Sequence, residues 1–401
     1  MKYTKDEVLQ YVKQENVWFI RLAFCDVFGK LKNIAILPSE LERAFEYGIA
    51  VDASAIAGFG GDVRSDLFLY PDPSTLTSLP WRSEDGGVVR MFCTVKYPDG
   101  RVLESDSRSL LEKAVEDAKK AGVEFNFGSE LEFYLFKTDS DGRPTFDPYD
   151  CAGYMDVAPE DKGENVRRMI CRTLMQMGMK PQTSHHEEGP GQNEIDFHYS
   201  DPLTAADHAI TFKSVVRSIA SMNGLHADFS PRPLSDSPGS GFHINISINN
   251  NKKNLLDHMI AGIMNRICDI TLFLNPIENS YQRIGSNKAP KYISWSSENR
   301  SQLIRVPAAR QNPYMELRSP DPTANPYIAF TLLIYAGLEG ISKKMELPES
   351  ADINLFTAGP ELTAKYKPLP ANLKEAIAAA KKSSFLKKYL PESIIKAYCE
   401  R

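Results

Sequence analysis

The sequence predicts an α+β fold that is divided between a small N-terminal domain and a larger C-terminal domain. A chain of 401 residues is long enough to bury two hydrophobic cores. Period-2 runs that are typical of strands recur along the chain, and the clearest is GSELEFYLF at residues 128–136. Amphipathic helical stretches alternate with such runs in the second part. We therefore place the domains at residues 1–105 and 106–401.

The composition excludes several classes of partner. The chain is 42% hydrophobic and 25% charged, with a formal net charge of −5, which indicates neither nucleic acid nor an anionic membrane as a partner. No apolar run approaches the ~20 residues that span a bilayer, and the N-terminus, MKYTKDEVLQ, lacks the apolar core of a secretion signal. The 6 cysteines are scattered without a CxxC pair, which is typical of reduced thiols in a cytoplasmic protein.

The N-terminal domain is predicted to be rich in strands. Thr4 and Glu7 form a capping box, so a first helix is expected to run to about Val12. The further elements expected here are strands at 17–26 and 31–37, a helix at 39–47, a loop at 51–61 and a strand at 88–95. Asp52 lies at the start of that loop, where a lone aspartate is more often a turn residue than part of a site.

The C-terminal domain is predicted to mix longer strands and helices. A helix at 108–120 is closed by Gly122, and the strand at 128–136 follows. The later elements are expected to be helices at 163–177 and 205–222, strands ending at 187 and spanning 191–197, 225–229 and 241–248, and short helices at 373–382, 385–389 and 391–400.

Acidic residues recur at strand-like positions in this second domain. Period 2 places Glu130 and Glu132 on one face of their strand, and two adjacent carboxylates repel each other unless a cation lies between them. The other candidate ligands for a hard cation are Glu187, Glu194, His243 and Glu316. Carboxylates with a single imidazole suit Mg²⁺ or Mn²⁺ rather than structural zinc. The set suffices for two metals, an arrangement that stabilises displacement at phosphorus.

A group of arginines follows these acids along the chain. Its members are Arg283, Arg300, Arg305, Arg310 and Arg318. Guanidinium groups match phosphate and carboxylate geometry, so arginines beside a metal cluster indicate a nucleotide and an acid substrate. No GxxxxGK[ST] pattern or kinase-type glycine loop is present.

Long motifs in a fixed order make the chain resemble glutamine synthetase of the prokaryotic type I form. They are GSELEFYLF, HHEEGPGQNEIDF, GSGFHINIS, NSYQRI, APKYISWSSENRSQLIRVP and ELRSPDPTANPYIAF. The resemblance implies an N-terminal β-grasp domain and a catalytic domain of antiparallel strands backed by helices. It also implies hexameric rings, commonly stacked into dodecamers, with each site formed between neighbouring subunits.

The resemblance implies a role for each candidate residue. The residues that match ligands of a first metal are Glu132, Glu187 and Glu194. Those that match ligands of a second metal, which contacts the nucleotide phosphates, are Glu130, His243 and Glu316. The positions that match the pocket of the acid substrate are Arg283, Arg318 and Gly239. The nucleotide site is matched by Arg300, Arg305 and Ser247, and the ammonium pocket by Asp52 and Tyr154.

The reaction that this resemblance implies has two steps. ATP transfers its γ-phosphoryl group to a carboxylate, which gives an acyl phosphate, and ammonia then displaces the phosphate to leave an amide. Phosphoryl transfer needs mainly positioning and charge neutralisation, which metals and arginines supply. An acid such as Asp52 can hold ammonium and take its proton.

Several positions depart from the family pattern. A flap of the type LVPGYEAP usually carries a glutamate next to Ala-Pro, and here Lys288 stands there. Pro238 replaces the asparagine before the Gly-Ser-Gly run, and Ala55 replaces a serine of the Asp52 loop. Phe356 falls where some relatives carry an adenylylated tyrosine. The tail is also shorter than usual, which leaves the hexamer and the dodecamer both open.

Three functions remain open on this sequence. The chain is a glutamine synthetase, a ligase that joins an acid such as glutamate to an organic amine, or a catalytically weak member that serves regulation or binding. The intact metal positions and arginines favour the first two.

Overall fold

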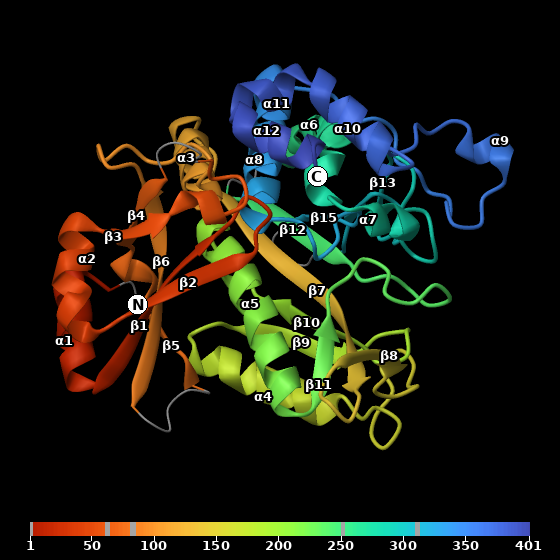
Figure 1. The fold of residues 1–401 in the computed structure, drawn as a ribbon. Coiled ribbons are helices and arrows are strands. Elements are labelled where there is room, and N and C mark those ends of the chain that lie inside the picture. The colour runs from red at the N-terminus through yellow and green to blue at the C-terminus, as the bar shows by residue number, and fades with distance from the viewer. Residues whose placement is uncertain (1–2, 61–64, 81–85, 250–252, 309–312) are drawn as a thin grey trace. The chain divides into compact units, whose positions relative to one another are not determined.

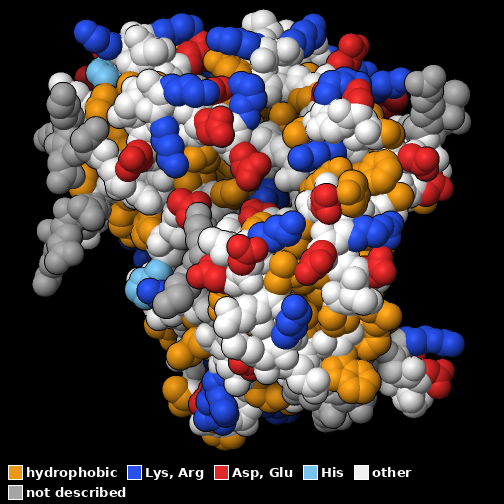
Figure 2. Space-filling view, turned by 90° about the vertical axis from the view of Figure 1, so that its left-hand side faces the viewer, with side chains coloured by type: hydrophobic (Ala, Val, Ile, Leu, Met, Phe, Trp, Pro, Cys, Tyr) orange, Lys and Arg blue, Asp and Glu red, His pale blue; other side chains and the backbone are white. Residues whose placement is uncertain are grey.

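The computed structural model describes residues 3–60, 65–80, 86–249, 253–308 and 313–401, which form two compact units (Figure 1). Unit 1 comprises Met1–Leu110 and Arg172–Met179, and unit 2 comprises Leu111–Cys171 and Lys180–Arg401. Arg310 lies outside the described residues. None of the described helices is long and apolar enough to cross a membrane. On the face that Figure 2 shows, basic and acidic side chains are interspersed.

Unit 1 is built on a six-stranded sheet. In sheet order its strands are β2 (Leu31–Ile36), β1 (Val17–Cys25), β6 (Gly87–Lys96), β4 (Asp66–Pro71) and β3 (Ile49–Asp52), with β5 (Thr77–Ser78) paired to β6. β1 and β6 run parallel, and β2 and β4 flank them in antiparallel directions. The helices that accompany the sheet are α1 (Lys5–Gln14) and α2 (Leu41–Tyr47). The capping box of Thr4 and Glu7 at the start of α1 is confirmed.

The expected loop at 51–61 is wrong at its start. Val51 and Asp52 end β3, where they pair with Leu67 and Asp66 of β4, and a short 3₁₀ turn, Ala53–Ala55, follows. Small residues favoured a loop in the sequence, but strand pairing with β4 satisfies the backbone here.

Unit 2 is built on a nine-stranded sheet. Its order is β13 (Trp295–Ser297), β14 (Ile304–Val306), β15 (Met315–Leu317), β12 (Phe242–Ile248), β7 (Phe125–Thr138), β10 (Gln192–Phe197) and β9 (Pro181–His186). Two further strands, β8 (Pro144–Pro148) and β11 (Leu225–Asp228), pair with β7. All neighbours are antiparallel except β13 and β14.

Helices cover one face of the central strands. They include α5 (Pro202–Met222) and α8 (Pro326–Lys343), and α6 (Lys253–Leu274) packs against α8. Phe133 of β7 packs edge-on against Phe212 of α5 with ring centroids 5.9 Å apart, and Phe127 stacks on Phe330 of α8 at 4.3 Å. Each such buried side chain contributes roughly 1.5–3 kcal/mol. Because side chains alternate along a strand, this packing directs the acids of β7 to the opposite face.

The remaining helices complete the element order. They are α3 (Ser107–Lys120), α4 (Glu164–Gln176), α7 (Glu278–Arg283), α9 (Pro360–Thr363), α10 (Leu373–Lys382), α11 (Ser384–Tyr389) and α12 (Glu392–Cys399). The helices expected from the sequence near 108–120, 163–177 and 205–222, and the three short ones near the C-terminus, are confirmed. The sequence did not predict α6 or the short strands β13, β14 and β15.

Candidate active site: a carboxylate and arginine cluster on the central strands

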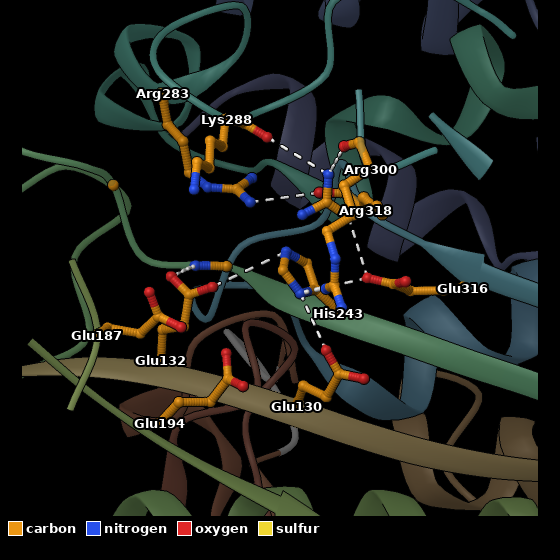
Figure 3. A network of polar contacts seen from close by, with 12 residues as sticks. Glu130, Glu132, Glu187, Glu194, His243, Arg283, Lys288, Arg300, Glu316 and Arg318 are labelled. Atoms are coloured by element: carbon orange, nitrogen blue, oxygen red, sulfur yellow. Dashed lines mark hydrogen bonds and ion pairs between the residues drawn. The ribbon is translucent and has the colours of Figure 1, made fainter. Parts of the chain in front are cut away.

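The register of three central strands brings the acids of unit 2 together. Glu130 of β7 lies opposite His243 of β12 on one side and Asp196 of β10 on the other, and Glu132 lies opposite Glu194. Directly opposed residues in antiparallel strands have Cβ atoms about 4.5–5.5 Å apart. Pairing alone therefore gathers these side chains on the face that the helices leave uncovered. Figure 3 shows Glu130, Glu132, Glu194 and His243 together, with the labelled arginines above them in the view.

Glu130, His243 and Glu316 form one subgroup. The Nδ1 of His243 lies 3.1 Å from Glu130 Oε2 and 3.7 Å from Glu316 Oε1. Candidate ligand atoms of all three lie within 4.8 Å of one another. Burial alone would raise the pKa of Glu130, but the hydrogen bond with His243 lowers it below its usual value. Asn245 supports this carboxylate by donating from Nδ2 to Oε1 over 2.6 Å.

Glu132, Glu187 and Glu194 form the other end of the cluster. Ligand atoms of Glu132 and Glu194 lie within 4.8 Å of each other and of His243, whereas Glu187 groups with Glu194 and with His185. The His185 Nε2 lies 3.1 Å from Glu187 Oε1 and 3.8 Å from Glu194 Oε1. The structure thus joins all six expected ligands into one continuous cluster, in which Glu130, Glu194 and His243 each belong to more than one group.

The electrostatics of this cluster suit a divalent cation. Burial raises the pKa of Glu194 well above its usual value, and the carboxylates of Asp196, Glu132 and Glu130 raise it further. Burial also raises the pKa of Glu132. Buried carboxylates this close disfavour one another's charged form. A hard cation would relieve the repulsion, and carboxylates with one imidazole are donors that Mg²⁺ and Mn²⁺ accept. The side chains therefore fit the metals that the sequence implied.

Two arginines hold Glu316, which is 1% exposed. Arg305 donates from Nη1 to Glu316 Oε2 over 2.7 Å, and Arg318 donates from Nε to Oε1 over 3.0 Å. Such charge-assisted pairs are stronger than neutral hydrogen bonds. They fix the carboxylate between the strands β14 and β15.

Arg283 is buried beside the cluster. It donates to the carbonyl oxygens of Ser319, over 2.8 Å, and Arg318, over 3.2 Å, and burial lowers its pKa. A Cβ atom on Gly239 would lie 2.4 Å from the carbonyl oxygen of Pro231 and 2.8 Å from Arg283 Cγ. Only glycine leaves room for this arginine, so Gly239 and Arg283 form one structural unit.

The other expected site residues lie around or outside the cluster. Arg300 is exposed, and its carbonyl oxygen accepts a hydrogen bond from Arg318. Ser247 lies on the same strand as His243, opposite Asn126 of β7. Tyr154 is 50% exposed and packs edge-on against His185, with ring centroids 5.4 Å apart.

Asp52 belongs to unit 1 and is not part of the unit 2 cluster. Its Oδ1 accepts hydrogen bonds from the backbone nitrogen and the hydroxyl of Ser54, over 2.9 and 2.7 Å. These bonds lower the pKa of the Asp52 carboxyl. Asp52 is thus an exposed residue at the end of β3, and its lowered pKa favours the ionised carboxylate.

The residues that depart from the family pattern have definite partners. The Lys288 side chain is 65% exposed and forms an ion pair with Glu188 in the turn between β9 and β10. The carbonyl oxygen of Lys288 lies 3.5 Å from Arg318 Nη1. The carbonyl oxygen of Pro238 accepts from the Tyr134 hydroxyl over 2.5 Å. The positive charge of Lys288 is thus paired with the Glu188 carboxylate and is not left unpaired beside an ammonium pocket.

Sequence reasoning missed four side chains that contact the cluster: His185, Gln192, Asp196 and Asn245. Gln192 donates from Nε2 to Glu132 Oε2 over 2.9 Å. The period-2 pattern that identified Glu130 and Glu132 also places Asp196 on the face of Glu194, and this signal was available in the sequence. Burial raises the pKa of Asp196 to about 6.

Comparison with family models matches nearly the whole chain. The model described as "Glutamine synthetase, beta-Grasp domain" matches residues 16–98, and "Glutamine synthetase, catalytic domain" matches residues 104–401. These matches confirm the expected fold, a β-grasp domain followed by a larger catalytic domain.

Similar proteins are found among curated sequences and solved structures. A glutamine synthetase of Clostridium saccharobutylicum is 42% identical, with 99% of this chain and 94% of the relative covered. One of Methanosarcina mazei is 44% identical, with 98% and 92% covered. A solved GmaS/ADP complex superposes with a TM-score of 0.88 at 24% identity, covering 98% of this chain and 94% of its own, and therefore shows likeness of fold. GmaS without ligand gives 0.86 at 25% identity, with 98% and 93% covered.

Proposed function

This chain belongs to the glutamine synthetase family, and from that premise we propose that it makes glutamine from glutamate and ammonia with ATP. Members of this family are ATP-dependent ligases, and the expectation of such an enzyme is confirmed at that level. The observation that carries the specific proposal is the continuous cluster of buried glutamates and His243, with arginines bonded directly to it.

We assign the two ends of the cluster to two divalent cations. One end has Glu132 and Glu194, with Glu187 joined to them through Glu194, and the other has Glu130, His243 and Glu316. Cations bound there would neutralise phosphate charge and orient the ATP γ-phosphate. Mg²⁺ and Mn²⁺ are the ions that suit these donors. The surplus of buried negative charge supports the assignment.

The arginines divide the two substrates between them. Arg283 and Arg318 are proposed to hold the acid, in a pocket that Gly239 keeps open. Arg300 and Arg305 are proposed to hold phosphate oxygens, with Ser247 near the adenine and ribose. Arg305 and Arg318 both donate hydrogen bonds to Glu316. The acid and the nucleotide would therefore meet beside the Glu316 carboxylate. Guanidinium groups suit both ligands.

The chemistry then follows in two displacements. A carboxylate oxygen of the acid attacks the γ-phosphorus, the bond to ADP breaks, and an acyl phosphate forms. The amine nitrogen attacks the carbonyl carbon, the C–O bond to phosphate breaks, and the amine loses a proton. Tyr154, beside His185, is proposed to line the amine pocket. Asp52, ionised through its bonds with Ser54, is proposed to receive that proton as a residue of the neighbouring subunit.

The assembly is proposed to be a ring of six subunits or a stack of two such rings. Asp52 and the cluster belong to different units of one chain, which is the arrangement expected when neighbours complete each other's sites. The cytoplasmic location stays a prediction.

A second candidate function is ligation of an organic amine, and Lys288 is the observation that favours it. An unpaired lysine about 4 Å from ammonium at an effective dielectric of about 20 would cost on the order of 4 kcal/mol. Glu188 pairs with Lys288 and offsets this charge. The ion pair therefore weakens the argument for an organic amine as the nucleophile and supports ammonia.

A panel of amines tests the proposal. ATP-dependent phosphate release with glutamate should be fastest with ammonium, compared with methylamine, ethanolamine and polyamines, for the native chain. The double swap Lys288→Glu with Glu188→Lys, which keeps the pair, serves as the matched control for Lys288→Glu alone. A native preference for an organic amine would replace the first candidate with the second. No turnover with any amine would favour a regulatory or binding role.

A further inference from the structure

A second polar network lies beside the turn of the β9–β10 hairpin, outside the cluster. It comprises Asp150, Asp161, Arg167, His186 and Asn193, which are each at most 4% exposed. None of these residues has a role in the chemistry described above. Buried charges are retained in proteins only when they are paired and hydrogen-bonded, so the contacts of this network define what it does.

His186 joins three segments of the chain. Its Nδ1 lies 2.6 Å from the carbonyl oxygen of Glu187, and its Nε2 lies 2.8 Å from Asp150 Oδ1. Its own carbonyl oxygen accepts from the backbone nitrogen of Met155 over 3.0 Å. Glu187 is a proposed cation ligand, and Met155 follows Tyr154 of the proposed amine pocket. His186 thus contacts both halves of the site, through its side chain at Glu187 and through its backbone at Met155.

Arg167 of α4 holds the other strand of the hairpin. Its Nη1 donates to Asp161 Oδ1 over 3.1 Å and to Asn193 Oδ1 over 2.6 Å, and its Nη2 lies 2.5 Å from Asp161 Oδ2. Asn193 directly precedes Glu194 in β10. Each of the two hairpin glutamates, Glu187 and Glu194, therefore follows a residue that is fixed in the buried network.

The network is an anchor rather than another metal site. Asp150, Asp161 and His186 lie close enough to hold an ion, but both oxygens of Asp161 already accept from Arg167. Asp150 accepts from the backbone nitrogens of Gly191 and Lys162, each over 3.0 Å, as well as facing His186. Each carboxylate of this network thus faces a basic side chain of the same network, Arg167 or His186, which supports an anchoring role.

We propose that His186 and Arg167 are positioning residues that hold Glu187 and Glu194 in a cation-binding geometry and, through Met155, fix the loop of Tyr154. The inference rests on the proposed function for the role of these glutamates and of Tyr154. Residues that contact metal ligands hold those ligands in the orientation that binding needs. Losing such a residue typically lowers metal affinity about 10–100-fold.

Direct binding of Mn²⁺ in the absence of ATP tests the anchor without turnover. His186→Gln should weaken Mn²⁺ binding about 10–100-fold while the chain stays folded by circular dichroism, because the substitution removes the imidazole contacts to Glu187 and Asp150. Arg266→Gln is the matched control. It also removes a basic side chain from an ion pair, but this pair joins Arg266 of α6 to Glu339 of α8 and includes none of the proposed cation ligands. It should lower the melting temperature and leave Mn²⁺ affinity unchanged.

The outcomes separate the anchor from the proposed function. If Glu132→Ala binds Mn²⁺ as tightly as the native chain, the metal assignment itself is wrong. If Glu132→Ala loses affinity while folded His186→Gln keeps it, only the anchor is overturned. Should His186→Gln fail to fold, Arg167→Lys keeps the charge but loses the two-pronged contact, and the same loss of Mn²⁺ affinity is expected. Native Mn²⁺ affinity in folded Arg167→Lys, or failure of both variants to fold, overturns the positioning role.

Discussion

Glu132 is the residue on which the site depends most directly. It lies 8% exposed at the centre of the cluster and accepts from Gln192 Nε2 and the backbone nitrogen of Gly241, each over 2.9 Å. Glu132→Ala removes a proposed cation ligand, so charge and geometry are lost together. ATP turnover should fall to background in a coupled phosphate assay. Glu116→Ala, which removes an exposed acid of α3, should turn over like the native chain, and an active Glu132→Ala would remove the basis of the metal assignment.

The sequence predicted the acids at this scale better than it predicted their partners. Glu130, Glu132 and Glu194 stood out because period-2 alternation distinguishes a polar face of a buried strand. His185 and Asn245 did not, because their role depends on which strand lies beside theirs. Asp196 carried the same signal as Glu194 and was overlooked.

An ion pair between two long helices gives a pH-dependent prediction at the scale of elements. Arg266 of α6 donates to both oxygens of Glu339 of α8, over 2.7 and 2.8 Å. The hydrogen bonds from Arg266 lower the pKa of Glu339 from 4.5 to about 2. A lowered carboxyl pKa stabilises the fold above 4.5, and this contribution is lost as the pH falls toward 2.

Glu339→Gln should therefore destabilise the protein by about 1–3 kcal/mol at pH 7. The difference from the native chain should shrink as the pH is lowered from 4.5 to 3, because Glu339 takes up a proton in the unfolded chain there while the folded pair still excludes it. Urea unfolding midpoints at pH 7 and pH 3 measure this. Glu116→Gln should show no such trend, and a native-minus-variant difference that does not change with pH would contradict the assignment of the pair.

Element prediction succeeded where an element carries its own pattern. A capping box predicted the helix α1, and the alternation of apolar and polar residues predicted the strand β7. The helix α6 did not, since consecutive buried residues such as Met259, Ile260 and Ala261 lie on different sides of it and blur the period that marks an amphipathic helix. Strands of three residues such as β14 exist only through pairing with neighbours, which the sequence does not reveal.

At the scale of the whole molecule, the proposed ring implies active sites that are shared between neighbouring subunits. Asp52→Ala and Glu132→Ala should each be nearly inactive alone. When the two variants are mixed and reassembled in equal amounts, about a quarter of the sites should combine an intact Asp52 from one subunit with an intact Glu132 from the next. Recovered activity near that fraction supports a ring. No recovery in confirmed mixed rings, or a fully active monomer by light scattering, would contradict it.

In the proposed reaction, a carboxylate is activated by phosphorylation before an amine attacks it. Glutamate labelled with ¹⁸O in its side-chain carboxylate tests this most directly, because the displaced phosphate must keep one oxygen from the acid. With ATP, Mg²⁺ and ammonium, mass spectrometry should find one ¹⁸O in each phosphate released with an amide formed. Phosphate that carries no ¹⁸O, with ammonium and with methylamine alike, would show that ATP is hydrolysed by water and would contradict the account.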